Sequence, residues 1–404
     1  MPTIKFRTLG CKVNQYDTQS IRERFLGHGF KEAKKSEKAE SYLINTCTVT
    51  SSADQKSRSV IRSCIKENPR AKIIVTGCMV SDDRSSLAKI KGVSWIISRG
   101  FFGEGVTDFY GHTRAFLKIQ DGCDNFCSYC KVSLVRGRSR SRPLAEIIKE
   151  GEALAKKGFK EIVLTGICLG AYGRDLSPQS NLTNVISKLE EITGILRIRL
   201  SSIEAGDVTD ALINQMAKSK KLCPHLHIPI QSGDNEILKK MKRKYSREFY
   251  LELIKKIKQK VPRVSITTDC LVGFPQESED NFKNTLDLVR KIAPLKTHIF
   301  PFSARKGTSA CEFKGMNNSD LIQERCRKLK QVSQVSALSY KKPFLGKVVD
   351  VLLEERVKAR PDFWQGYTSN YIRVLVKSRD NLKNKIVSVK LKEIKDDDIL
   401  GTRI

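Results

Sequence analysis

Three cysteines lie close together in the segment DGCDNFCSYC, with the spacing C-x3-C-x2-C: Cys123, Cys127 and Cys130. A structural zinc site commonly takes four ligands from two C-x2-C pairs. The local sequence offers three thiols and no fourth cysteine or histidine beside them. A 4Fe–4S cube held by three thiolates leaves one iron free to bind a cofactor. The spacing therefore favours a catalytic iron–sulfur cluster, unless a distant residue supplies a fourth ligand.

A second set of cysteines follows short apolar segments that alternate with helical patterns in the first hundred residues: Cys11, Cys47 and Cys78. Such alternation is typical of a parallel α/β sheet, and the carboxyl ends of parallel strands lie at one edge, where ligands bind. We therefore expect these thiols to converge on one site, unless they are core residues, as cysteines often are. The predicted strands are TIKFRTLG, SYLINT and KIIVTG.

The remaining six of the 12 cysteines are predicted to be core residues. Cys64 shares one apolar helical face with Val60 and Ile61. The other five lack the mutual spacing of metal ligands: Cys168, Cys223, Cys270, Cys311 and Cys326. The chain starts without a signal-peptide pattern, so we expect a cytoplasmic protein whose thiols stay reduced.

The elements that would position these cysteines suggest an α/β protein of three domains. Residues 1–108 are expected to form the parallel α/β sheet. Within residues 109–338, six strand-then-helix units predict a partial (βα)6 barrel, which would keep its chemistry at the carboxyl ends of its strands. Residues 339–404 lose helical periodicity and alternate β-branched residues, which predicts a small all-β barrel.

The chain is strongly basic: its 404 residues include 74 Lys and Arg against 44 Asp and Glu, a formal net charge of +30. Such a field attracts polyanions, so nucleic acid is the expected partner unless the lysines are merely spread over solvated faces. Hydrophobic residues make up 40% of the chain, enough for proper cores. No apolar run approaches the roughly 18–20 residues of a membrane span, and no membrane partner is expected.

Two groups of side chains could contact such a partner. Aromatic residues lie among charges in the C-terminal segment and could stack on bases, or could be ordinary core residues: Phe363, Trp364, Tyr367 and Tyr371. In RGRSRSR the arginines lie two apart, so an extended segment would present them on one side. They would contact a phosphate or a cofactor carboxylate, or form a solvated run: Arg136, Arg138, Arg140 and Arg142.

The combined motifs resemble a known family. C-x3-C-x2-C after the first strand of a (βα) barrel resembles the signature of radical S-adenosylmethionine (radical SAM) enzymes. The surrounding segments are similar to those of the methylthiotransferases, and the C-terminal part resembles their RNA-binding TRAM domain. The segments are LGCKVNQYD, INTCTVTSSADQKSR, VTGCM, GCDNFCSYC, RGRSRSR, LTGICLGAYG, RLSSIE, HLHIPIQSGDNEILKKMKRKY, TTDCLVGFP and FPFSARKGTSA.

The resemblance implies two 4Fe–4S clusters with different tasks. Cys123, Cys127 and Cys130 would bind the radical-generating cluster, whose open iron chelates S-adenosylmethionine. The other cluster would carry the sulfur that becomes a methylthio group at C2 of an adenine ring, and would be held by Cys11, Cys47 and Cys78.

The resemblance also implies contacts with S-adenosylmethionine. Thr165 and Gly166 would approach its methionine end, while its ribose and adenine would meet Ser202, Glu204, Gln231 and Gly273. A polar residue at a strand end is equally a candidate for a simple capping role.

TLGCKVNQYD and GYTSNYIRV most resemble the branch acting on N6-threonylcarbamoyladenosine at position 37 of tRNA, in the anticodon stem-loop. The alternative substrate is N6-isopentenyladenosine, and the basic C-terminal barrel argues against the branch that modifies a ribosomal protein. The threonylcarbamoyl carboxylate should meet a cation near the barrel mouth: Arg136, Arg138 or Arg305. An electron donor such as flavodoxin or ferredoxin is implied as a further partner.

The sequence departs from the family pattern at four positions, although all six cysteines are present: Lys131, Ser133, Ala205 and Gln276. We expect these departures to affect how the substrate fits near Lys131 and how the loop folds near Gln276. Two hypotheses compete with the enzyme: a non-catalytic RNA-binding protein with a closed zinc site, and a one-cluster radical enzyme whose N-terminal cysteines only pack.

Overall fold

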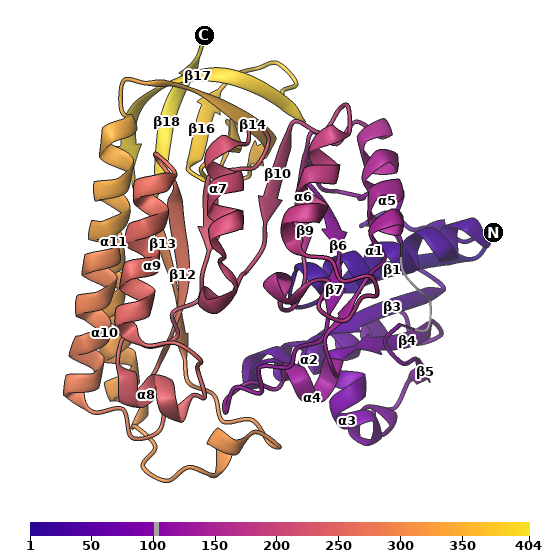
Figure 1. Cartoon of the computed structure of the whole chain (residues 1–404). Helices are drawn as coiled ribbons and strands as arrows, with labels where there is room; N and C mark the ends of the chain where they lie inside the picture. Colours follow the sequence, from indigo (N-terminus) through magenta and orange to yellow (C-terminus); the bar gives the residue numbers. More distant parts are fainter. Residues whose placement is uncertain (101–104) are drawn as a thin grey trace.

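The computed structural model describes residues 1–100 and 105–404. In chain order it contains a parallel sheet with helices, an open barrel of parallel strands surrounded by helices, and a small β barrel (Figure 1). The α/β fold with a C-terminal β barrel is therefore confirmed.

The N-terminal sheet has the strand order β2-β1-β3-β4-β5, with parallel neighbours. Helix α1 packs on one face against Phe6 and Leu43, while α2 and α3 pack on the other against Tyr42 and Ile44. Because helices cover both faces, β3 is buried along its whole length. The bounds are β1 Thr3–Thr8, α1 Lys12–Gly27, β2 Lys31–Glu32, β3 Ser41–Thr46, α2 Ser51–Glu67, β4 Lys72–Gly77, α3 Cys78–Ala88 and β5 Val93–Ile96.

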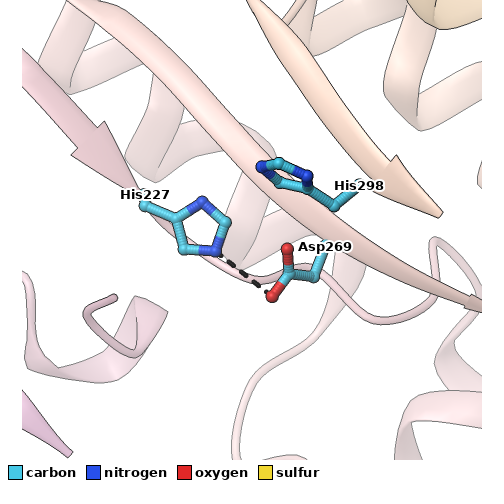
Figure 2. A group of neighbouring side chains, drawn as sticks. All are labelled: His227, Asp269 and His298. Atoms are coloured by element: carbon cyan, nitrogen blue, oxygen red, sulfur yellow. Dashed lines mark ion pairs between the residues drawn. The ribbon is translucent and has the colours of Figure 1, made fainter. Parts of the chain in front are cut away.

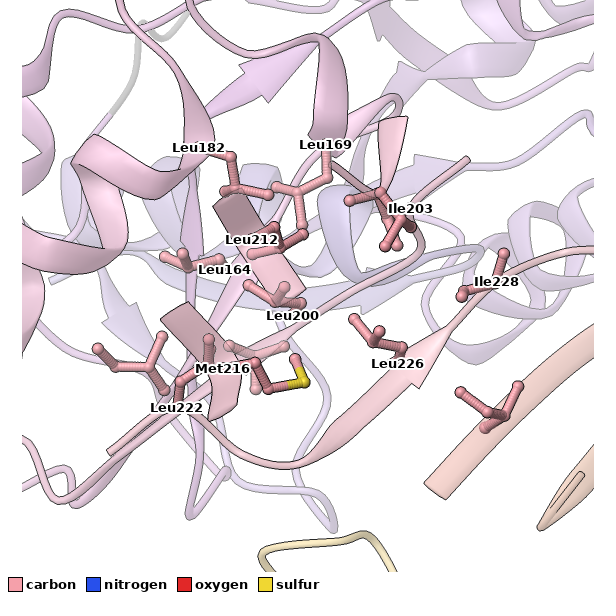
Figure 3. Close-up of a cluster of buried hydrophobic side chains, with 14 of the residues drawn as sticks. Leu164, Leu169, Leu182, Leu200, Ile203, Leu212, Met216, Leu222, Leu226 and Ile228 are labelled. Carbon is pink, nitrogen blue, oxygen red and sulfur yellow. The ribbon is translucent and has the colours of Figure 1, made fainter. Parts of the chain in front are cut away.

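The central barrel consists, within the described residues, of two parallel three-stranded sheets, β10-β9-β6 and β11-β12-β13. A bridge between Ser202 and His227 joins the sheets, which gives the predicted six-stranded open barrel. Leucine and isoleucine side chains of the strands and their helices form its core (Figure 3). The strands are β6 Ala115–Lys118, β9 Glu161–Thr165, β10 Arg197–Leu200, β11 His225–His227, β12 Ser265–Val272 and β13 Lys296–Pro301.

Helices connect these strands, and their first residues are encoded locally. Ser246 accepts a hydrogen bond from the N–H of Phe249 at the start of α9, and Ser278 forms a capping box with Asn281 at the start of α10. The helices are α5 Leu144–Lys156, α6 Leu182–Glu191, α7 Asp210–Lys218, α8 Asn235–Lys240, α9 Arg247–Lys260, α10 Glu279–Ile292 and α11 Ser319–Lys341. The predicted domain limit at residue 338 falls within the last turn of α11.

The C-terminal barrel is closed, with the strand order β14-β15-β16-β18-β17. Closure removes free sheet edges, which would otherwise invite pairing with other chains. Its strands are β14 Val348–Val357, β15 Arg360–Thr368, β16 Arg373–Lys377, β17 Lys385–Lys395 and β18 Asp398–Arg403.

The C-terminal barrel covers the amino-terminal ends of the central strands. Arg199 pairs with buried Glu161 at 2.6 Å and also donates to the carbonyl of Ser369 at 2.9 Å. Burial opposes ionisation of Glu161, yet the surrounding arginines keep its pKa below the usual range. Tyr371 stacks on His225, with ring centroids 4.5 Å apart. The two domains therefore share one polar interface.

This interface corrects one expectation about base stacking. Tyr367 and Tyr371 stack on each other beneath the central barrel, with Arg114 over both rings. Trp364 is buried in the core of the C-terminal barrel, where its Nε1 donates to the carbonyl of Asp380. The rings of these three aromatic residues pack against protein, as the alternative of ordinary core residues predicts.

None of the helices in the described parts of the chain combines the length and apolar character that a membrane crossing requires.

Candidate active site

The first cysteine group lies in the loop between β7 (Gln120–Asp121) and α4 (Val132–Arg136), at the carboxyl end of the first barrel strand. Cys123, Cys127 and Cys130 are all half-buried free thiols. Gly122 precedes the group with φ +74°, and a Cβ there would lie 1.9 Å from the carbonyl oxygen of Arg138. Only glycine fits this turn, which holds the loop against the segment after α4.

Each of these thiols has a distinct environment. A hydrogen bond from Cys168 lowers the pKa of Cys123 to about 7, and the Asn125 N–H also donates to the Cys123 Sγ at 3.4 Å. Arg243 Nη1 lies 3.4 Å from the Sγ of Cys127. Burial raises the pKa of Cys130 to about 12. Metal ligation would have to deprotonate this buried thiol.

Two neighbours of this group were not predicted. Arg243 forms an ion pair with Glu204 and so links a predicted cofactor residue to Cys127. Cys168 is buried, as expected of a core residue, but its thiol lies beside Cys123 and 3.7 Å from Asp207 Oδ2. The sequence around Cys168 and Arg243 does not predict these contacts. The only hint is that Cys168 lies in the LTGICLGAYG segment and Arg243 in the HLHIPIQSGDNEILKKMKRKY segment.

The spacing of the thiols does not fit a single metal ion. Four-coordinate zinc with Zn–S bonds of about 2.3 Å brings sulfur atoms within roughly 4 Å of one another. Among the described residues, no three cysteine sulfurs lie within 4.8 Å of one another.

The second cysteine group lies at the carboxyl edge of the N-terminal sheet. Cys11 is exposed at the N-cap of α1, Cys47 directly follows β3, and Cys78 opens α3. A Cβ on Gly10, whose φ is +100°, would lie 3.1 Å from the Sγ of Cys47, so the first loop packs directly on the second. The structure brings these cysteines together, and their role as cluster ligands stays a prediction.

Burial raises the pKa of Cys78 to about 11 and also raises that of Cys47. The guanidinium of Arg136 acts in the opposite direction on both thiols. Arg136 is itself buried between Asp121, at 2.9 Å, and Asn14. A barrel residue therefore supplies positive charge next to the N-terminal cysteines.

This position corrects the expectation for RGRSRSR. Arg136 ends α4 and Arg142 is buried with Glu150, so neither shares an exposed face with Arg138 and Arg140. Arg305, the other proposed carboxylate contact, is buried and donates to the carbonyl of Thr48 at 3.0 Å. Arg136 and Arg305 are thus occupied within the protein.

Lys131, one of the departures from the family pattern, forms a buried ion pair in the structure. Its Nζ lies 2.6 Å from Asp82 on α3, and the lysine is buried next to Cys130. Asp82 also accepts from Thr48, which follows Cys47. One ion pair thus connects the loops that carry both cysteine groups. Gln276 takes φ +65° and donates its backbone N–H to the carbonyl of Gly315.

The predicted cofactor residues all lie at or just beyond the carboxyl ends of barrel strands. Thr165 ends β9, and a Cβ on Gly166 would lie 3.0 Å from Gln120 Oε1. Ser202 and Gln231 lie on either side of the junction of the two sheets. Gly273 follows β12 with φ +80° and packs on Ile322 of α11. These positions surround the loop of the first cysteine group, although packing alone explains the two glycines.

Two family models match the chain. The model described as the radical SAM superfamily covers residues 117–289, and the one described as uncharacterized protein family UPF0004 covers residues 3–98. The first contains one cysteine group and the second contains the other.

Similar curated proteins extend over nearly the whole chain. The threonylcarbamoyladenosine tRNA methylthiotransferase MtaB of Bacillus subtilis (strain 168) is 38% identical, covering 97% of this chain and 94% of the relative. The protein of the same name from Thermotoga maritima is 34% identical, over 100% and 97%. A tRNA-2-methylthio-N(6)-dimethylallyladenosine synthase of Clostridium tetani is also 34% identical, over 96% and 93%.

Among solved structures, the radical S-adenosylmethionine methyltransferase TsrM of Kitasatospora setae superposes with a TM-score of 0.55 and 12% identity, covering 74% of this chain and 73% of that one. This likeness supports the fold of the barrel. The near full-length relatives determine the family: the chain belongs to the radical S-adenosylmethionine methylthiotransferases, enzymes that use S-adenosylmethionine and two 4Fe–4S clusters.

Proposed function

We propose that this protein methylthiolates C2 of N6-threonylcarbamoyladenosine at position 37 of tRNA. The observation that carries the proposal is the similarity to three threonylcarbamoyladenosine methylthiotransferases at 34–38% identity over nearly the whole chain. The dimethylallyladenosine synthases reach a similar 33–34%, so the substrate must be tested directly.

In this proposal the two cysteine groups hold different clusters. Cys123, Cys127 and Cys130 hold the one that binds S-adenosylmethionine, and Cys11, Cys47 and Cys78 hold the other. When bound, these groups supply hydrogen abstraction at C2 of the adenine and the sulfur that replaces the hydrogen. The chain's own residues position them: the Lys131–Asp82 pair ties the two loops together, and Arg243 donates toward Cys127.

The remaining cofactor residues are proposed to line the path of S-adenosylmethionine at the strand ends: Thr165, Gly166, Ser202, Glu204, Gln231 and Gly273. The Arg243–Glu204 ion pair supports this arrangement, because it places a carboxylate next to the cluster loop. The Glu204 carboxylate is thus already paired with the Arg243 guanidinium when S-adenosylmethionine binds.

The proposed partners follow from this reaction. Residues 1–108 and 109–338 would carry the chemistry, and residues 339–404 would bind the anticodon stem-loop of tRNA. A flavodoxin or ferredoxin would supply electrons, and the reaction would take place in the cytoplasm. The formal charge of +30 supports a polyanionic substrate.

Nucleoside mass spectrometry of tRNA from a strain that lacks the gene tests the substrate. We expect 2-methylthio-threonylcarbamoyladenosine to disappear and its unmethylthiolated precursor to accumulate. Restoring the gene should reverse both changes. If 2-methylthio-isopentenyladenosine disappears instead, the chemistry stands and the substrate is wrong.

The basic surface of the C-terminal barrel leads to a second expectation. Lys390 and Lys392 are exposed on β17, and replacing both by glutamine should weaken tRNA binding. The slope of log affinity against log salt should fall by about one unit for each lysine that contacts a phosphate. Titrations at several salt concentrations measure it. Lys35 and Lys38, exposed in the N-terminal domain, are the control pair, and an equal loss from that pair would contradict the assignment.

A further inference from the structure

The lumen of the central barrel contains a polar group that the cluster sites do not use. His227, Asp269 and His298 come from the neighbouring strands β11, β12 and β13, and their side chains point toward one another (Figure 2). Nε2 of His227 lies 3.2 Å from Asp269, and its Nδ1 lies 2.9 Å from the Thr267 hydroxyl. All three are half-buried, so the lumen beside them is polar and accessible.

Lys12 lies one helical turn before Tyr16, on the side of α1 that faces the barrel. It is the first residue of α1 and directly follows Cys11. The first turns of α1 are fixed to the barrel, because Asp17 pairs with Lys118 of β6 at 2.7 Å and the Tyr16 hydroxyl lies 3.0 Å from Glu150. The amino-terminal end of α1 therefore faces the boundary between the two cysteine-bearing domains.

Electrostatics across this boundary agrees with the geometry. Burial lowers the pKa of His225 and of His298, and neighbouring cations, Lys12 among them, lower both further. Arg114 and Lys12 lower the pKa of Tyr371, against the effect of burial.

Lys12 differs from the buried cations near the two cysteine groups, which pair with carboxylates. Its side chain is exposed and, in the described part of the chain, has no ion-pair partner. By contrast, Lys131 pairs with Asp82, Arg136 with Asp121 and Arg305 with Asp54. An exposed ammonium next to Cys11, on the barrel side of α1, can pair with an anionic substituent.

We propose that Lys12 determines substrate specificity by binding the carboxylate on the N6 substituent of the target adenosine. The inference rests on the proposed function, because an isopentenyl group carries no charge. The adenine C2 must approach the sulfur held near Cys11, so a cation on the adjacent residue can reach the far end of the same nucleoside. Of the arginines that the sequence offered for this role, Arg136 and Arg305 are buried in ion pairs, and exposed Arg138 lies 3.3 Å from Asp124.

The test compares two RNA stem-loops, one with threonylcarbamoyladenosine and one with the primary amide in place of its carboxylate. The loaded wild-type enzyme should favour the carboxylate by about 10- to 100-fold in both Kd and kcat/KM, the range of a charge-assisted hydrogen bond. In Lys12→Met this preference should fall to within about 3-fold, and Lys12→Arg should retain most of it.

Arg24→Met removes the same charge from the other end of α1 and should keep the wild-type preference. Iron and sulfide contents of all variants should match the wild type. A Lys12→Met enzyme that loses activity equally on both RNAs, or keeps the full preference, overturns the inference. A wild-type enzyme that modifies an isopentenyladenosine stem-loop and neither of these two would instead overturn the proposed function.

Discussion

Replacing Cys123, Cys127 or Cys130 by alanine is expected to reduce reductive cleavage of S-adenosylmethionine to the background rate. The reason is the number of thiols: each would hold one iron, and a cube with an open iron has no spare protein ligand. The second cluster should persist, because its proposed ligands lie in another domain. Anaerobic assays of 5′-deoxyadenosine, with iron and sulfide analysis, measure both properties.

Cys168 provides a demanding control for these variants. The Cys168 thiol lies beside that of Cys123, but Cys168 does not belong to the C-x3-C-x2-C segment. Cys168→Ala should therefore keep cleavage activity and lose only the hydrogen bond to Cys123. Undiminished 5′-deoxyadenosine from all three loop variants would end the assignment, and loss in Cys168→Ala would indicate a fourth ligand.

Replacing Cys11, Cys47 or Cys78 by alanine should have a different effect: cleavage continues while methylthiolation of tRNA is lost. These thiols lie at the edge of the N-terminal sheet, away from the loop that would bind S-adenosylmethionine. The iron content should fall to about that of one cluster, since a 4Fe–4S cluster needs its thiolate ligands. Product analysis and iron determination on the same preparations test this.

Cys64 is the matched control for the second group. It is buried on α2, in the core between the helix and the sheet, and lies in the same domain. Cys64→Ala should cost stability through the lost packing, about 1–2 kcal/mol, and leave the iron content unchanged. Wild-type product from the Cys11, Cys47 and Cys78 variants would make these cysteines structural and favour a one-cluster enzyme.

Local patterns in the sequence predicted most of the architecture. Strands β3 and β4 begin and end at the predicted residues, because each is a continuous apolar run between polar segments. Helix α9 begins directly after Ser246, whose side chain accepts from the N–H of Phe249. The small C-terminal barrel predicted from β-branched alternation over residues 339–404 is also confirmed.

Contacts between distant segments could not be predicted in the same way. Cys168 reaches Cys123 because β6 and β9 are neighbouring strands of the barrel, and Lys131 reaches Asp82 because the barrel and the N-terminal sheet pack together. The prediction that the arginines of RGRSRSR share one exposed side was wrong for a related reason. Gly137 ends α4 with a positive φ, so Arg136 belongs to a helix and Arg138 to the loop after it. A period of two in the sequence cannot reveal such a break.

The polar interface beneath the central barrel limits how freely the C-terminal barrel could be exchanged for another domain. Glu161 begins β9, Arg197 and Arg199 belong to β10, and both arginines donate to carbonyl groups of the C-terminal barrel. A foreign domain grafted at this point would remove those carbonyl acceptors and leave Glu161 as the partner of both guanidinium groups, which would destabilise the interface. A substitution in either partner of this interface therefore has to be matched by the other, which couples the C-terminal barrel to the strands that it covers.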